Sequence, residues 1–149
     1  MSDIVRSLWN QIASWVPTKE VHTVVVKEVE KMNLGAAAGK NFIRIAGLSG
    51  GLAVIMSAYG AHAFNSKTED TRLKNVFESG NKMHLIHSVA LLGVPLTRRP
   101  MLVGTLMTSG ILIFSGTCYY QAMTGDGRVR KATPYGGILL ILSWFAMIL

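Results

Sequence analysis

Three histidines are the side chains of this sequence with the clearest capacity for chemistry. His84 and His87 are three residues apart and therefore share one face of a helix, and His62 closes the apolar run that precedes them. Ionisable groups at membrane depth are costly, so they invite a functional interpretation with a named partner. Three imidazoles that converge could hold a metal ion or a haem iron, or they could contact the headgroup of a lipid or quinone.

A structural role is the competing interpretation of these histidines, and we favour it. The sequence shows no HExxH motif, no inward-facing pair of carboxylates and no fourth ligand. Imidazoles near a membrane interface more often hydrogen-bond to backbone carbonyls, or to Tyr and Asn side chains of a neighbouring helix. We rank a headgroup contact second and a metal or haem third, and we predict no metal and no cofactor.

A polar turn precedes the two later histidines. Glu78 and Asn81 could form a proton or headgroup site, but Glu78 also stands four residues before Lys82, in the order that favours an ion pair on a helix. Ser115 and Cys118 have no base on their helical face, so we predict no nucleophile and no enzymatic activity. The candidates for lipid contacts or a polar cluster are His62, Glu78, Asn81, His84 and His87.

Composition indicates a membrane protein. The 149 residues are 50% hydrophobic, and residues 1–41 carry nine charged side chains whereas residues 103–124 and 133–149 carry none. The net charge of +7 is not arranged as a basic stripe with aromatics, which argues against nucleic acid and for anionic lipid headgroups. We predict an all-α, polytopic membrane protein with an N-terminal arm (1–41) and a four-helix transmembrane domain (42–149).

The elements that must position the polar residues are four apolar runs. We expect spans at 42–63, 76–96, 101–123 and 134–149, with a flexible or closely packed connector at 33–40 and a polar loop at 65–75. The second span is the shortest in apolar length, with only about 13 residues counted from His84, so its start lies between Val76 and His84. Gly47 and Gly51 are spaced for close approach of a neighbouring helix, so we expect the first span to sit centrally in the bundle.

The arm begins with an amphipathic pattern. Apolar residues recur at helical spacing over residues 4–16 and include Trp9 and Trp15, which suits either a membrane interface or docking onto a partner protein. Residues 21–32 are compatible with a helix or an extended segment. Basic residues flank the predicted spans on both sides, so the positive-inside rule does not assign an orientation.

Several segments of the predicted transmembrane domain together resemble a known family. Residues 58–63 read AYGAHA, residues 77–92 read FESGNKMHLIHSVALL, and similar matches occur at 110–120, 123–125 and 133–137. This pattern resembles the transmembrane protein 256 family over about residues 42–149. The resemblance implies a four-span helical protein with no established catalytic activity, and its eukaryotic members imply a multi-pass protein of the mitochondrial inner membrane.

Our functional hypothesis combines the resemblance with the arm, which departs from the family pattern. We expect a non-catalytic accessory subunit or assembly factor of a respiratory-chain complex, such as complex I or a supercomplex. Its partners would be membrane lipids and other membrane-protein subunits, with Gly47 and Gly51 packing laterally and Trp9 and Trp15 docking the arm. The alternative is a small oligomeric transporter or channel that uses the His/Glu cluster.

Overall fold

The structure, a computed structural model, describes residue 7 and residues 18–149, and these residues form helices and no strand. The chain divides into two compact units, residues 1–34 and 35–149. The amphipathic helix predicted at 4–16, with Trp9 and Trp15, lies outside the described residues. The predicted domain division at residue 41 stays a prediction.

The first long helix is α2 (Thr18–Tyr59), which continues into a π-helical turn, η1 (Gly60–Phe64), and a short α3 (Asn65–Lys67). Residues 21–32 are therefore helical, and the connector predicted at 33–40 is wrong. No proline occurs between residues 18 and 94. Residues 36–38 are alanines, and alanine has the highest helix propensity of any residue type. The favourable helix propensity of these alanines offsets the unfavourable propensity of the two glycines that flank them.

The second helix is α4 (Thr71–Ala90), and it is followed by the 3₁₀ helix η2 (Leu91–Leu96). It starts earlier than expected because Asp70 caps it: the Asp70 Oδ1 atom accepts from the backbone N–H of Arg72 at 2.8 Å and of Leu73 at 3.4 Å. The polar loop predicted at 65–75 shortens accordingly to residues 68–70.

The helix predicted at 101–123 is confirmed almost to the residue as α5 (Pro100–Thr124), which has its proline in the first turn. Gly125 follows with a φ of 72°, a left-handed conformation that glycine adopts without steric penalty and that ends the helix. A short 3₁₀ helix, η3 (Gly127–Lys131), then leads to α6 (Thr133–Ala146).

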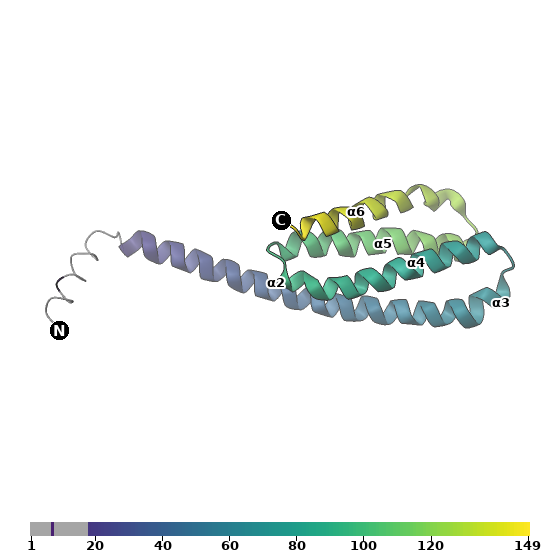
Figure 1. Ribbon diagram of the computed structural model, residues 1–149, viewed down its shortest axis with the longest axis horizontal. Coiled ribbons are helices and arrows are strands. Elements are labelled where there is room, and N and C mark those ends of the chain that lie inside the picture. Colours follow the sequence, from purple (N-terminus) through teal and green to yellow (C-terminus); the bar gives the residue numbers. More distant parts are fainter. Residues whose placement is uncertain (1–6, 8–17) are drawn as a thin grey trace. The chain divides into compact units, whose positions relative to one another are not determined.

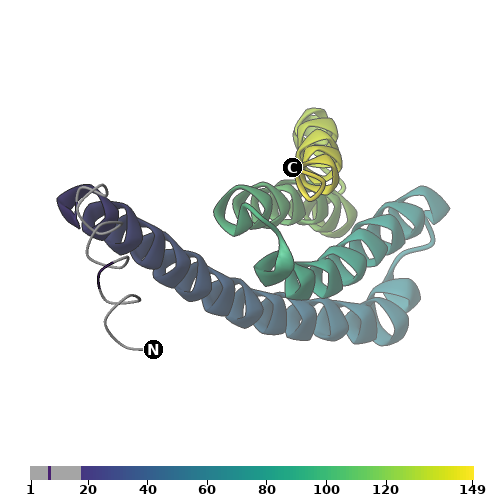
Figure 2. The ribbon, with the colours of Figure 1, turned by 60° about the vertical axis from the view of Figure 1, so that its left-hand side comes forward.

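Helix α5, and not the first span, is central in the unit 35–149. It lies between α4 and α6 and contacts both (Figure 1), and the turned view in Figure 2 shows the same order. In its most apolar window 39% of the residues are buried, compared with 17% for the window of the first span. One core cluster consists of Phe42, Ala46, Leu91, Val94, Val103, Met107, Ile111, Leu140 and Ala146, and a second consists of Phe64, Phe77 and Ala122.

Glycines that face a neighbour explain why α5 is central. A β-carbon at Gly104 would lie 2.4 Å from the Phe42 ring, and one at Gly110 would lie 2.6 Å from the Leu140 side chain. By contrast, a β-carbon at Gly47 or Gly51 would meet no atom within 4 Å. The close approach predicted for Gly47 and Gly51 is therefore not made inside this unit, and their role in lateral packing stays a prediction.

Two helical stretches among the described residues are long and apolar enough to cross a membrane: Gly39–Lys67 and Pro100–Thr124, with mean hydropathies of 1.5 and 1.6. The predicted second and fourth spans do not meet the same test. Helix α6 has 14 residues, fewer than the roughly 20 that span a hydrocarbon core, and α4 carries polar side chains along its length.

Candidate functional site

His84 lies at the centre of a partly buried chain of polar side chains that joins three helices. Its Nδ1 atom is 3.2 Å from the Tyr119 hydroxyl of α5, and its Nε2 atom is 3.1 Å from the Ser49 hydroxyl of α2. The Tyr119 hydroxyl donates to Asn81 Oδ1 at 2.8 Å. Asn81 and His84 are only 8% and 9% exposed, so protein side chains replace the water that these groups would otherwise bind.

A second serine continues the chain. The Ser88 hydroxyl donates to the His84 carbonyl oxygen at 2.7 Å and lies 2.6 Å from the Ser49 hydroxyl. Ser49 is thus the contact through which α2 joins the polar groups of α4. Neither Ser49 nor Ser88 is recognisable from the sequence, because a lone serine in an apolar run carries no periodic signal.

The directions of these bonds follow from proton counting. Since the Tyr119 proton goes to Asn81, the Tyr119 oxygen must accept from His84 Nδ1, and a neutral ring then presents a bare Nε2 that accepts from Ser49. Ser88 uses its own proton on the His84 carbonyl, so the Ser49–Ser88 contact has no proton left.

His87 occupies a separate place. Its Nδ1 atom donates to the Met83 carbonyl oxygen at 2.8 Å, and its Nε2 atom accepts from the Trp144 indole N–H at 3.1 Å. The two rings meet edge-on with centroids 6.0 Å apart. Both nitrogens are therefore engaged, and the ring joins α4 to α6.

The three histidines do not converge. His62 lies exposed on η1, whereas His84 and His87 are buried in α4 and bind different partners. Within the residues that the structure describes, no three His, Cys, Asp or Glu side chains are grouped to hold a metal ion. The predicted alternative of a metal or haem held by His62, His84 and His87 together is therefore not supported by their positions.

The ion pair predicted between Glu78 and Lys82 is confirmed: the Lys82 Nζ and Glu78 Oε1 atoms are 3.2 Å apart, and both side chains are about two-thirds exposed. Glu78 and Asn81 also line one polar cavity of about 370 Å³ beside η1, together with Asn65, Lys74 and Asn75. Asn81 therefore connects this cavity to the Tyr119–His84 chain.

A second cavity, of about 430 Å³, lies between α2 and α5. Its lining includes Ser49, His84 and Tyr119 from the polar chain, and also Thr108 and Ser115 of α5. The hydroxyls of Thr108 and Ser115 are buried and have no hydrogen-bond partner in the described structure. Their spacing offered a signal that the sequence analysis missed, because polar residues at 108, 115 and 119 lie on one face of an otherwise apolar helix.

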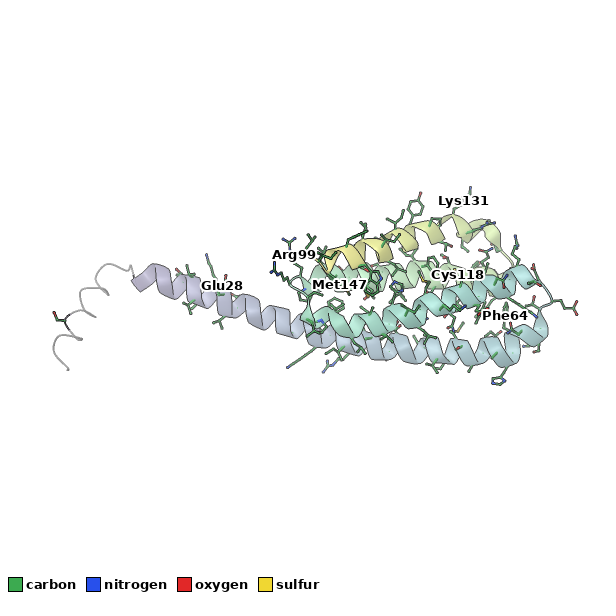
Figure 3. All side chains as sticks on the ribbon, viewed as in Figure 1. Glu28, Phe64, Arg99, Cys118, Lys131 and Met147 are labelled. Atoms are coloured by element: carbon green, nitrogen blue, oxygen red, sulfur yellow. The ribbon has the colours of Figure 1, made fainter. Side chains whose placement is uncertain are left out.

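Charged side chains occur at both ends of the unit 35–149 as well as on α4 (Figure 3). Arg99 and Met147 lie at one end and Phe64 and Lys131 at the other, as Figure 3 shows. In the loop before α6, the Arg128 side chain lies 2.8 Å from Asp126 Oδ2, and its hydrogen bonds, followed by that of the Arg128 backbone, hold the pKa of the Asp126 carboxyl below its usual value.

Comparison with known proteins places the chain in a family. A family model described as "Protein of unknown function (DUF423)" matches residues 56–137. The UPF0382 membrane protein YwdK of Bacillus subtilis is 31% identical over 73% of this chain and 94% of its own length. The UPF0382 membrane protein C1782.12c of Schizosaccharomyces pombe is 28% identical over 70% of this chain and 95% of its own.

These relatives confirm the family resemblance and support a membrane location with transmembrane helices. A further relative, from Haemophilus influenzae, is 29% identical over 71% of this chain, so the shared region is present in bacteria as well as in a yeast. The bacterial relatives argue against a location specific to the mitochondrial inner membrane, and no relative shows a respiratory role. No solved structure matches the chain. The chain belongs to the DUF423 family of membrane proteins.

Proposed function

We propose that this protein crosses the membrane four times and acts without catalysis, as an accessory subunit or assembly factor that binds other membrane proteins. The single observation that carries the proposal is the open face of α2 around Gly47 and Gly51. Both glycines are exposed, and neither is used for packing within the unit. Small residues on an open face let a second backbone come close, which is how helices associate in lipid.

The outward faces of the unit suit a lipid and protein environment. Large apolar side chains are exposed on both outer helices, including Leu48 at 73%, Ile55 at 63% and Phe145 at 63%. Helix α6 and the residues after it form a 17-residue stretch without charge (133–149), which supports a short fourth span. The polar side chains of α4 that face inward bind Tyr119 of α5 or the α4 backbone, which supports a second span despite its polar sequence.

The N-terminal unit supports a docking role. Val24, Val25, Val26 and Val29 are between 46% and 60% exposed in a helical segment that also contains two lysines and two glutamates. Such a mixture does not suit the hydrocarbon core, and exposed valines favour contact with a protein partner. About a quarter of this chain lies outside the region shared with relatives that are themselves almost fully covered.

Cross-linking in native membranes followed by purification and mass spectrometry tests the partner. We expect Gly47→Leu to reduce recovery of the partner, whereas Gly93→Leu, at another glycine with no atom near its missing β-carbon, should leave recovery unchanged. If the solubilised protein runs only at monomer mass on native gels, the proposal fails. A respiratory complex among the recovered proteins would support that narrower prediction.

The number of spans has its own test. Four spans place both ends of the chain on the same side of the membrane, whereas an odd number separates them. Tags at the two ends should therefore be digested together, or protected together, when protease is added to sealed vesicles. Protection of one tag alone would contradict the four-span arrangement.

A small oligomeric transporter or channel is a second candidate, and one observation favours it. The hydrogen-bonded chain runs from Asn81, in the polar cavity beside η1, through Tyr119 and His84 to Ser49 inside the unit. His62 and His87 take no part in this chain, so the polar path is shorter than the sequence predicted. Proton flux into proteoliposomes that is abolished by His84→Ala would favour this candidate, and absence of flux would eliminate it.

A further inference from the structure

The cavity between α2 and α5 has the size and the walls of a ligand site. Its volume of about 430 Å³ falls within the range of roughly 300–1,000 Å³ that is typical of small-molecule pockets. Leu48, Leu52 and Leu112 line it, and these side chains are 73%, 57% and 69% exposed. The cavity is therefore bordered by outward-facing apolar side chains, the surroundings through which a hydrocarbon chain enters from lipid.

Two hydroxyl groups in the lining of the cavity have no hydrogen-bond acceptor among the described residues. Three other hydroxyls of α5, those of Thr105, Thr117 and Thr124, each donate to the carbonyl oxygen four residues earlier, at 2.7 Å. Thr108 and Ser115 do not, although both are buried and both line the cavity, and Ser115 is only 2% exposed. A buried donor without an acceptor is unfavourable, so these two hydroxyls are suited to an oxygen atom supplied by a ligand.

The charge of the lining restricts the ligand. No Asp, Glu, Lys or Arg lines this cavity, and its histidine, His84, is already bonded to Tyr119 and Ser49. A phosphate or carboxylate would find no cationic partner and would be buried at high cost. The ligand must therefore be neutral and must present an oxygen that accepts from a hydroxyl.

The depth of the site separates it from ordinary lipid contacts. Ser49 lies four residues before residue 53, the midpoint of Gly39–Lys67, and Ser115 lies three residues after residue 112, the midpoint of Pro100–Thr124. At 1.5 Å per residue, both hydroxyls are within about 6 Å of the middle of their helices. Phospholipid headgroups remain at the two surfaces of the bilayer, so they do not reach this depth.

We propose that this cavity binds a neutral amphiphile with two carbonyl oxygens, one accepting from Ser115 and the other from Thr108 two helical turns away, and with a hydrocarbon chain that leaves past Leu48 and Leu112. Isoprenoid quinones and diacylglycerols both have this chemistry. Such a ligand would be bound in addition to the protein partner proposed above. It depends on the membrane location and is independent of the partner.

Binding to the purified full-length protein in detergent micelles tests the proposal. Decylubiquinone and dioctanoylglycerol are titrated separately, dodecane serves as a probe without oxygen, and the bound fraction is measured by native mass spectrometry. We expect saturable binding of at least one oxygen-bearing probe. Ser115→Ala and Thr108→Val should each weaken it about threefold to tenfold, the effect of losing one neutral hydrogen bond.

Matched variants separate loss of the site from loss of the fold. Thr105→Val removes a hydroxyl of the same helix outside the cavity and should leave binding unchanged. Gly116→Leu fills the cavity at a position where a β-carbon meets nothing within 4 Å, and it should weaken binding more than tenfold, whereas Gly93→Leu should not. Far-UV circular dichroism confirms that each variant is folded.

The preferred probe identifies the source of the ligand, because only one of the two contains a quinone ring. The proposal is overturned if neither oxygen-bearing probe binds saturably. It is equally overturned if dodecane binds as tightly as they do, or if the folded Ser115→Ala and Thr108→Val proteins bind them as tightly as the wild type. In those cases the cavity accepts hydrocarbon without recognising an oxygen.

Discussion

Two adjacent glycines at the start of α6 offer a direct test of how α5 and α6 pack. A β-carbon at Gly136 would lie 2.4 Å from the Phe114 backbone nitrogen and 2.8 Å from its Cα atom. At Gly137 the nearest atoms would be ring carbons of the same phenylalanine at 3.6 and 3.7 Å, which is ordinary van der Waals contact. Gly136→Ala should therefore force the helices apart, and Gly137→Ala should not.

The magnitude follows from two opposing contributions. Overpacking of a close contact destabilises by about 1–3 kcal/mol, and the upper end applies to Gly136 because a backbone cannot rotate away as a side chain can. Alanine stabilises a helix interior by about 0.5–1 kcal/mol relative to glycine. We expect Gly136→Ala to lower the free energy of unfolding by about 2 kcal/mol, and Gly137→Ala to raise it by up to about 1 kcal/mol.

The assay is reversible unfolding of the purified protein in mixed micelles of dodecyl maltoside and sodium dodecyl sulfate, followed by far-UV circular dichroism. The two variants add the same methyl group to neighbouring positions of one helix, so their difference reports the contact with Phe114. Equal stabilities of the two variants, or a Gly136→Ala protein as stable as the wild type, would refute the described packing of α6 on α5.

The same unfolding assay checks three further predictions. Tyr119→Phe removes the hydroxyl shared by two buried side chains of α4 and should destabilise by about 1–3 kcal/mol; no change would mean that the polar chain is not formed. Trp144→Phe removes the donor to His87 and should destabilise by about 1 kcal/mol, whereas an unchanged stability would contradict that bond. Glu78→Gln breaks an exposed ion pair and should change stability by less than about 0.5 kcal/mol, and a larger loss would show that the pair is shielded from solvent.

Much of the helical architecture could be predicted because it depends on local properties. The uncharged run at 101–123, with a proline before it and glycine after it, corresponds to α5, and the spacing of Glu78 and Lys82 corresponds to their ion pair. The segment 33–40, predicted as a connector, is helical because its alanines favour a helix more than its two glycines oppose one. Helix α4 starts earlier than predicted because Asp70 caps it.

The candidate site was less predictable, because its members come from distant parts of the chain. His84 and Asn81 were identified as candidates, but their partners Ser49 and Tyr119 lie 35 and 38 residues away in sequence. His62 and His87 resemble His84 in residue type and context, and yet neither joins the polar chain. Sequence spacing describes one helix at a time, so it does not say which faces of different helices meet.

Hydropathy and helix-ending residues in the printed sequence are enough to establish an all-helical membrane protein, and the motifs are enough to establish its family. The central position of α5 depends on contacts between helices. Gly104 and Gly47 are the same residue type in similar apolar runs, but one lies against the Phe42 ring and the other faces outward. That difference arises from the way the helices pack together, because a glycine permits close approach but does not specify the helix that approaches it.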